Sequence, residues 1–189
     1  MKALALLSLV LAWAPPWEAW LGVFPAHMLR HMILVAVSAP LLVLAFPGFG
    51  RAMAVPPVLA TALEFAMIWG WHLPAAHGAA YRHLPLFVVE QASFLLVGCL
   101  IWGACLDRRG PGQALAGAGG LLLTSMHMTL LGALMILAPR DLYAEWCGTV
   151  PSVSGQQLGG MIMLAVGTPI YLIGGLWRVS QVLNDGRTA

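Results

Sequence analysis

Long runs of apolar residues, interrupted by short polar segments, cover most of this chain. Each run has about the 20 residues that an α-helix needs to cross the hydrocarbon core of a bilayer. Proline or glycine lies at the boundaries of most runs, where helices commonly begin or end. The pattern therefore predicts five membrane helices, over residues 26–46, 57–73, 84–105, 114–138 and 156–177.

A shorter apolar segment, residues 3–14, precedes these five. As a helix it is only about 18 Å long. The lysine before it and the Ala-Trp-Ala at its end resemble the flanks of a signal peptide. Cleavage there would leave Pro15 directly after the cut, where proline is poorly accepted, and the following PPWEAW is typical of a tryptophan anchor at the membrane interface. We therefore predict a short sixth helix.

The composition agrees with a membrane protein. Of the 189 residues, 60% are hydrophobic and 8% are charged, whereas soluble domains carry about 25% charged residues. The net charge is +2 and the basic residues are scattered along the chain, so a nucleic-acid-binding surface is excluded. We predict a single all-α domain over residues 1–189, a polytopic transmembrane bundle of about six helices in a lipid bilayer.

The basic residues predict an orientation. Loops rich in lysine and arginine stay in the cytoplasm. The segment LDRRGPGQ, the C-terminal tail, the loop around Arg51 and the Met1-Lys2 start fall on the same side when the spans are counted. Both termini are therefore predicted to be cytoplasmic, and the loops at 14–26, 74–83 and 139–155 extracytoplasmic. The basic residues that carry this prediction are Lys2, Arg51, Arg108, Arg109, Arg178 and Arg187.

Histidine and methionine gather at the predicted outer side. His27 and His31 begin the 26–46 helix and, being four residues apart, share one helix face. Met28 and Met32 repeat this spacing on the neighbouring stripe. Imidazoles and thioethers do not help a helix to enter a membrane, but both are ligands of soft metals.

Further residues of the same kinds extend this pattern. His72 ends the 57–73 span, and the following outer loop contributes His77 and His83. A single methionine or buried histidine is more often a packing residue, so the joint placement of these side chains is what favours a metal site. The additional candidates lie further along the chain: His127, Met128, Met161 and Met163.

The ligand types favour copper. Neutral imidazole and thioether groups suit Cu(I), whereas zinc more usually recruits cysteine or carboxylate and calcium or magnesium requires oxygen ligands. Uncharged ligands also avoid the cost of burying ionised groups near the bilayer. We predict a Cu(I) site where the helices meet the extracytoplasmic face.

Two carboxylates fall inside predicted spans. Glu64 lies eight residues before His72 and shares its helix face, and Glu90 lies seven residues after His83 in the same way. An ionisable group inside a membrane span is a functional candidate. The alternative is a hydrogen-bonded carboxyl group that joins two helices, and both readings stay open for Glu64 and Glu90.

The cysteines and the remaining motifs give no sign of catalysis. Cys99, Cys105 and Cys147 show no zinc-like spacing, so we interpret them as packing residues, with a spare metal ligand as the alternative for Cys147. The chain contains no Walker loop, G-x-S-x-G, H-E-x-x-H or G-x-G-x-x-G motif. We predict that the protein is not an enzyme.

Three stretches carry a resemblance to a known family. HMLRHMILVAVSAPLLVLAFP, WGWHLPAAHGAAYRHLP and QQLGGMIML resemble the CtaG-type cytochrome c oxidase assembly factors, and the likeness extends from about residue 20 to residue 177. It implies an all-helical protein of the bacterial inner membrane that serves a copper centre of a haem-copper oxidase. It also implies that His27, His31 and His72 are functional positions, together with Met161 and Met163.

Two departures from the family pattern bear on the number of ligands. Gln156-Gln157 stands where relatives commonly have Asp-Gln, and Glu90-Gln91 stands where the family has Glu-His. Gln91 either leaves a ligand missing or supplies a hydrogen bond instead.

The leading hypothesis is a copper-binding assembly factor. It would hold Cu(I) near His27, His31 and His72 and pass it to an oxidase subunit, directly or with a periplasmic copper carrier as a further partner. The glycine-rich helix faces leave room for a homodimer.

Two alternatives stay open at this stage. A copper transporter would use Glu64, His127 and Met128 as a middle station, but the cytoplasmic end offers only cysteines as soft ligands. A b-type haem protein would use His31 and His72 as axial ligands, but the cytoplasmic side has no histidine for a second haem.

Overall fold

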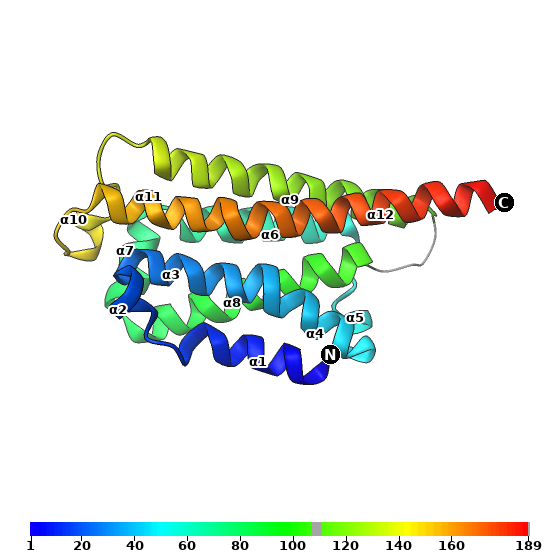
Figure 1. Cartoon of the computed structure of the whole chain (residues 1–189), viewed down its shortest axis with the longest axis horizontal. Coiled ribbons are helices and arrows are strands. Elements are labelled where there is room, and N and C mark those ends of the chain that lie inside the picture. Colours follow the sequence, from blue (N-terminus) through cyan, green and yellow to red (C-terminus); the bar gives the residue numbers. More distant parts are fainter. Residues whose placement is uncertain (107–110, 189) are drawn as a thin grey trace.

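Helices make up almost all of the structure, a computed structural model that describes residues 1–106 and 111–188, without the side chains of residues 111 and 185–188. No strand occurs among the described residues. Arg108 and Arg109 lie outside the described residues, as does the side chain of Arg187. The all-α bundle predicted from the sequence is confirmed (Figure 1).

Its elements are α1 (Lys2–Trp13), α2 (Trp17–Leu21), α3 (Val23–Met32), η1 (Ile33–Ser38), α4 (Ala39–Ala45), α5 (Pro47–Met53), α6 (Pro57–Trp71), α7 (Pro74–Arg82), α8 (Leu84–Leu106), α9 (Pro111–Leu137), α10 (Ala144–Cys147), α11 (Val153–Ile162), η2 (Met163–Gly167) and α12 (Thr168–Thr188).

Within the described residues, four helices are long and apolar enough to cross a membrane. They are Val23–Ala45, Leu84–Leu106, Gly112–Leu137 and Val153–Asn184. The predicted 57–73 span is α6, which has 15 residues and is about 22 Å long. It counts as a fifth span only together with α5, to which it is bent by 83°. The predicted N-terminal helix is present as α1.

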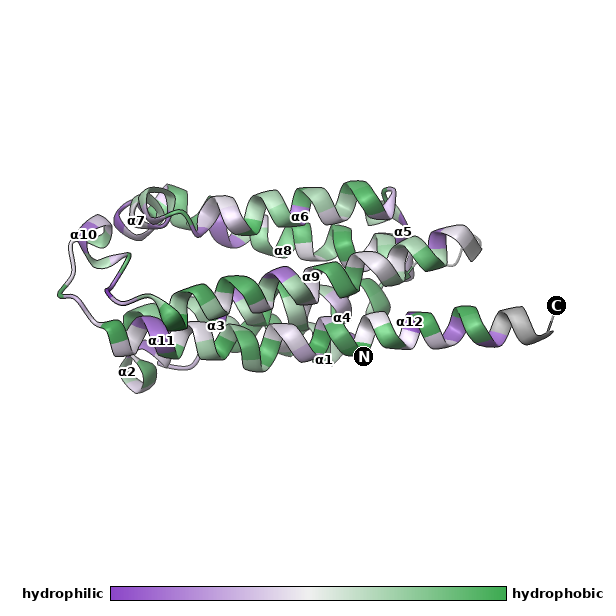
Figure 2. Ribbon diagram, turned by 90° about the horizontal axis from the view of Figure 1, so that it is seen from above, coloured by the Kyte–Doolittle hydropathy of each residue, from purple (hydrophilic) through white to green (hydrophobic). Residues whose placement is uncertain are grey.

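The surface and the interior have the polarity expected of a membrane protein. Hydrophobic residues predominate along the long helices (Figure 2), and examples such as Val58 and Leu130 are 74% and 53% exposed. Glu64 and Glu90 are fully buried instead. Because lipid cannot satisfy ionisable groups, these belong inside the bundle.

The ends of the bundle differ in content. Both termini and α5 lie at one end, and α2, α7 and α10 lie at the other (Figure 1); we call the latter the α7 end. The predicted outer loops are partly helical here, because residues 74–82 form α7 and residues 144–147 form α10. The Asp141 carboxylate orders the second of these segments by accepting hydrogen bonds from the backbone N–H groups of Tyr143, Ala144 and Ser152.

Two short π-helical segments, η1 and η2, interrupt long spans. A π turn bonds residue i to i+5 and departs from the regular α-helical pattern. In η1, the carbonyl oxygen of Val35 accepts hydrogen bonds from Trp102 Nε1 at 3.1 Å and from the Tyr171 hydroxyl at 3.2 Å. Side chains of α8 and α12 therefore satisfy this carbonyl inside the apolar core, where an unmet group would be costly.

Gly78 allows α7 and α10 to touch through their backbones. A Cβ atom at this position would lie 2.5 Å from the backbone oxygen of Trp146 and 2.7 Å from its carbonyl carbon. We expect Gly78→Ala to push α10 away and to lower the free energy of unfolding by about 1–3 kcal/mol. Thermal melting in detergent measures this effect.

Gly70→Ala is the matched control, because a Cβ atom there would meet no atom within 4 Å. Alanine is favoured over glycine in a helix by about 1 kcal/mol, so the melting temperature of this variant should hold or rise. Equal melting temperatures for the two variants would contradict the tight contact at Gly78.

Candidate metal centre

Three helices bring two histidines and a carboxylate together near the α7 end. His27 comes from α3, His77 from α7 and Glu90 from α8. His27 Nε2 lies 3.0 Å from Glu90 Oε2, and His77 Nδ1 lies 3.9 Å from Glu90 Oε1. All three side chains are buried, and one ligand atom from each lies within 4.8 Å of the other two. This spacing is compatible with a single bound metal ion.

One polar atom of each residue in this cluster lacks a hydrogen bond. His27 Nε2, His77 Nδ1 and Glu90 Oε1 have no hydrogen-bond partner among the described residues. His27 Nε2 lies within ion-pair distance of Glu90 Oε2, but the angle between the two groups is not that of a hydrogen bond. Buried polar atoms are nearly always hydrogen-bonded, so three residues whose ligand atoms gather within 4.8 Å and which each keep an atom without a hydrogen bond could satisfy a metal ion.

Gln91 orients two members of the site. Its Nε2 atom lies 3.0 Å from His31 Nε2 and 3.2 Å from Glu90 Oε2. An amide nitrogen carries two hydrogens, so it can donate one to each partner. The sequence left two alternatives for Gln91, and the structure places it as a hydrogen-bond donor that holds both the imidazole and the carboxylate.

His72 presents a free ring nitrogen. Its Nδ1 lies 2.7 Å from the carbonyl oxygen of Ile68, and because a carbonyl can only accept, Nδ1 carries the proton. Nε2 is then the nitrogen with the lone pair, and it is buried without a hydrogen-bond partner. The Tyr143 hydroxyl donates to the His72 carbonyl at 3.1 Å and so fixes the end of α6.

Four buried histidines near the α7 end form a continuous row. The ring centroids of His77 and His27 are 4.7 Å apart, those of His27 and His31 are 4.4 Å apart, and those of His31 and His72 are 5.8 Å apart. Phe94 stacks on His31 at 3.8 Å. These rings pack tightly, and Phe94 shields the inner end of the row.

Comparison with known proteins decides the family. The family model described as cytochrome c oxidase caa3 assembly factor matches residues 3–185, nearly the whole chain. The chain belongs to this family. The resemblance seen in the sequence is thereby confirmed, and an assembly-factor family points to a non-catalytic role. No curated protein and no solved structure matches the chain.

The methionines of α3 in this assembly factor do not face the histidine row. A Cβ atom at Gly159 would lie 2.9 Å from Met28 Cγ, and one at Gly167 would lie 3.0 Å from Met32 Sδ. Both methionines therefore pack against α11 and η2, whereas the histidines of the same helix face α8. The structure does not bring this thioether stripe to the cluster.

Two other sequence-predicted candidates are exposed, and a third is buried in the apolar core. Met161 is 49% exposed on α11, and His83 is exposed at the end of α7. Met163 is fully buried in the apolar core. The sequence placed these residues near the α7 end, but it could not predict the direction in which each side chain points.

Glu64 and His127 form a separate pair between α6 and α9. Glu64 Oε2 lies 2.8 Å from His127 Nε2 and accepts a hydrogen bond from the Thr124 hydroxyl at 3.2 Å. This geometry corresponds to the second sequence alternative for Glu64, a hydrogen-bonded carboxyl group joining two helices. Met128, the next residue after His127, is fully buried in the core.

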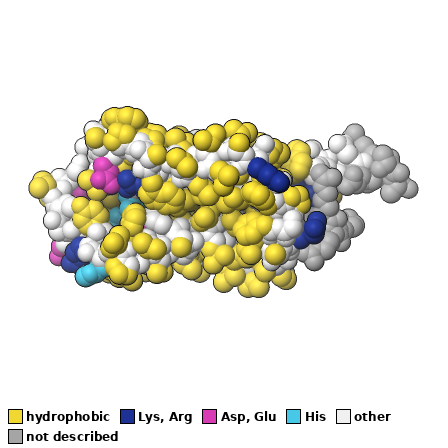
Figure 3. Space-filling view, turned by 90° about the horizontal axis from the view of Figure 1, so that it is seen from below, with side chains coloured by type: hydrophobic (Ala, Val, Ile, Leu, Met, Phe, Trp, Pro, Cys, Tyr) yellow, Lys and Arg dark blue, Asp and Glu magenta, His cyan; other side chains and the backbone are white. Residues whose placement is uncertain are grey.

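A cavity of about 450 Å³ opens at the α7 end and is lined by His27 and His77, with Asp141 and Cys147 also in its wall. In the space-filling view, the histidine side chains visible on that face lie at this end (Figure 3). Burial, and next the neighbouring His27, hold the pKa of His77 well below its usual value. The imidazole is therefore neutral at pH 7, which is the form that binds a metal.

Cys147 is a buried member of the apolar core, which agrees with its interpretation as a packing residue. The sequence did not predict that it also lies in α10, in the wall of this cavity. Burial raises the pKa of its thiol to about 11, with a contribution from Asp141, so the thiol is protonated at pH 7. A solitary cysteine gives no spacing from which this placement could be predicted.

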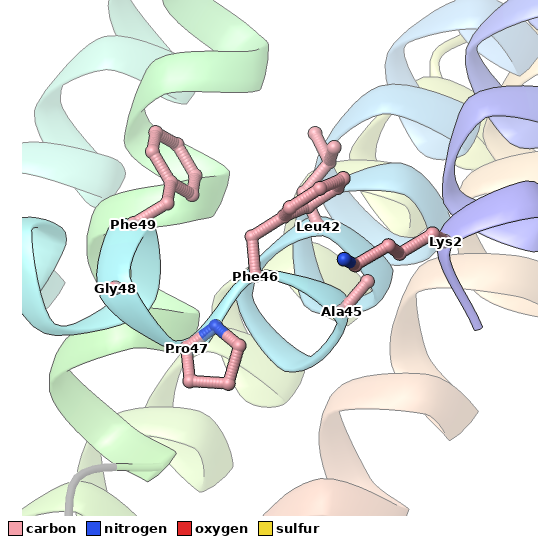
Figure 4. A pocket seen from close by; sticks show the side chains of 7 residues that line it. All are labelled: Lys2, Leu42, Ala45, Phe46, Pro47, Gly48 and Phe49. Atoms are coloured by element: carbon pink, nitrogen blue, oxygen red, sulfur yellow. The ribbon is translucent and has the colours of Figure 1, made fainter.

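A larger hollow, of about 560 Å³, lies at the opposite end of the bundle (Figure 4). Its walls are apolar apart from Lys2, whose Nζ atom is 5.6 Å from the ring centroid of Phe46. A cation over an aromatic ring is a favourable contact, but the seven lining residues include no soft-metal ligand. The candidate metal ligands that the structure brings together therefore lie at the α7 end.

Proposed function

We propose that this assembly factor holds Cu(I) as cargo at His27, His77 and Glu90 and delivers it to a subunit of a haem-copper cytochrome c oxidase. By the positive-inside rule the α7 end then faces the periplasm, with both termini in the cytoplasm of a bacterium and the spans in its inner membrane. The proposal rests on the family, on the ligand atoms of His27, His77 and Glu90 that lie within 4.8 Å of one another, on one atom of each residue that has no hydrogen-bond partner, and on the charge of the cluster.

The charge of the cluster favours a monovalent ion. Glu90 supplies one negative charge and the imidazoles are neutral ligands, so Cu(I) would make the cluster neutral overall. A divalent ion would leave a net positive charge in a buried site, where uncompensated charge is costly. Imidazole is a good ligand for copper, and the carboxylate serves mainly to balance the charge.

The histidine row supports transfer by ligand exchange. His31 lies next to His27, and His72 lies next to His31, at the centroid distances given above. An ion held by few ligands can bind an incoming imidazole before an earlier ligand leaves. His31 and His72 would thus be secondary positions for the same ion, not a separate site.

The two alternatives drawn from the sequence receive less support. A haem between His31 and His72 would need space for a porphyrin, but Phe94 stacks on His31 at 3.8 Å and lies 6.0 Å from His72, measured between ring centroids. A transporter would need a chain of free ligands through the bundle, and the middle pair of Glu64 and His127 is engaged in its own hydrogen bond.

Metal content tests the proposal. Detergent-purified protein would be loaded with Cu(I) under reducing conditions, or with Zn(II) in parallel, desalted and analysed by mass spectrometry. We expect near-stoichiometric copper and little zinc in the wild type. The double variant His27→Ala/His77→Ala should lose the copper, because it lacks both nitrogen ligands.

His83→Ala is the matched control, since His83 is a histidine at the same end of the bundle but is exposed. It should retain copper like the wild type. Copper retained by the double variant, or a preference for zinc, would contradict the proposed site.

A further inference from the structure

The cavity at the α7 end offers a sulfur ligand beside the metal centre. Cys147 lies in its wall together with His27 and His77. The cysteine is 7% exposed and has no disulfide partner. His27 and His77 are 4% and 1% exposed, and His27 Nε2 and His77 Nδ1 have no hydrogen-bond partner. The cavity therefore combines a thiol with two buried, unpaired imidazole nitrogens.

The packing of α7 on α10 keeps these groups on adjoining walls. Gly78 and Trp146 touch through their backbones, and they directly adjoin His77 and Cys147 in sequence. The ring of Tyr143, which also lines the cavity, lies 4.9 Å from the ring of His77. A metal complex that enters the cavity would thus meet the thiol and the imidazoles in one space.

We propose that the cavity is the entry route for copper, and that Cys147 takes Cu(I) from an incoming thiolate complex and passes it to His27 and His77. This inference rests on the proposed function and adds the chemical class of the copper donor. Thiolates bind Cu(I) strongly, so a donor of this class releases its copper more readily to another sulfur than directly to an imidazole.

The exchange conserves charge and protons. The bond between copper and the donor sulfur breaks as a bond between copper and Cys147 Sγ forms, and the thiol proton of Cys147 moves to the donor thiolate. Copper then moves to the imidazoles, and Cys147 takes up one proton from a water molecule in the open cavity, which leaves one hydroxide ion in the solvent. Copper remains Cu(I) throughout, so no oxidant or reductant is required.

Loading kinetics test the inference on the full-length protein in detergent. The probe is Cu(I) supplied as its glutathione complex, and the readouts are the loading rate and the copper content at the end point. Cys147→Ser should load copper about 10-fold more slowly than the wild type, which is comparable with the effect of losing a residue that supports a metal site. At the end point it should contain as much copper as the wild type.

Two variants control for a loss of structure. Cys99→Ser removes another buried free thiol, in α8, and should load at the wild-type rate. Cys147→Met keeps a soft sulfur ligand and should restore rapid loading. A wild-type loading rate in Cys147→Ser, or a loss of copper at its end point, would overturn the relay and leave the proposed function standing. Failure of the wild type to retain any copper would overturn both.

Discussion

Replacing Glu90 with glutamine is expected to weaken Cu(I) binding by about 100-fold or more, beyond the range seen when a supporting residue of a metal site is lost. Glutamine has nearly the same shape, so the packing around the row of histidines should persist. The carboxylate charge disappears, however, and Cu(I) would then carry an unbalanced positive charge in a buried site. Competition with a chromophoric Cu(I) chelator measures the affinity.

The chain provides its own control for this substitution. Glu64 is also fully buried, within another helix, and is hydrogen-bonded to His127. Glu64→Gln makes the same chemical change away from the metal centre, so Cu(I) affinity should stay within a few-fold of the wild type. If both variants lost affinity equally, the effect would stem from the fold, and the charge-balance argument for Cu(I) would fail.

A second large effect is expected on the oxidase itself. In a strain whose chromosomal gene for this protein carries His27→Ala/His77→Ala, the copper content and the activity of the haem-copper oxidase should fall to the level of a strain that lacks the gene. When the free copper concentration lies below the dissociation constant, the fraction of protein with bound copper falls in proportion to the affinity. Each loss of about 1.4 kcal/mol in binding free energy lowers the affinity tenfold, so the copper available to the oxidase should fall tenfold as well. Membrane oxidase activity and copper per haem would be measured together.

Copper supplementation separates delivery from scaffolding. If the protein delivers the metal, an excess of copper salts in the medium should restore part of the oxidase activity of the double variant. His83→Ala should need no supplement. Failure of copper to rescue a stably inserted double variant would indicate that the protein supports the oxidase by contact, without carrying its metal.

The sequence predicted the elements of this bundle better than their facing directions. The length of the apolar runs was enough to predict the long helices, because the thickness of the bilayer sets the length of a membrane-spanning helix. It could not predict α5 or the bend at Pro56–Pro57, because a broken span and a short helix have the same composition. The four-residue spacing of His27 and His31 correctly implied a shared face, since helix geometry alone determines it.

The composition of the candidate site depends on tertiary contacts, and the spacing of residues along the chain does not predict these contacts. Met28 and Met32 follow the same periodicity as the histidines, yet α11 packs on their stripe and α8 on the other. His77 and His83 are close in sequence, but α7 turns one inward and leaves the other at its exposed end. Glu90 was identified as an ionisable group inside a span, and its partners became clear only once α3, α7 and α8 were brought together.

The π turn in η1 has a consequence for how this chain can change in length. A π turn holds one residue more than the α-helix that it interrupts, so deleting one residue within 33–38 would let the span continue as a regular α-helix. The two parts of the span would then face nearly as before, because the π turn spreads its extra residue over about the same rotation. Deleting one residue from the regular α-helix α4 would instead rotate the part that carries His27 and His31 by about 100° and turn both histidines away from α8. The extra residue in η1 is therefore one that the span can lose while it keeps the imidazoles beside their carboxylate.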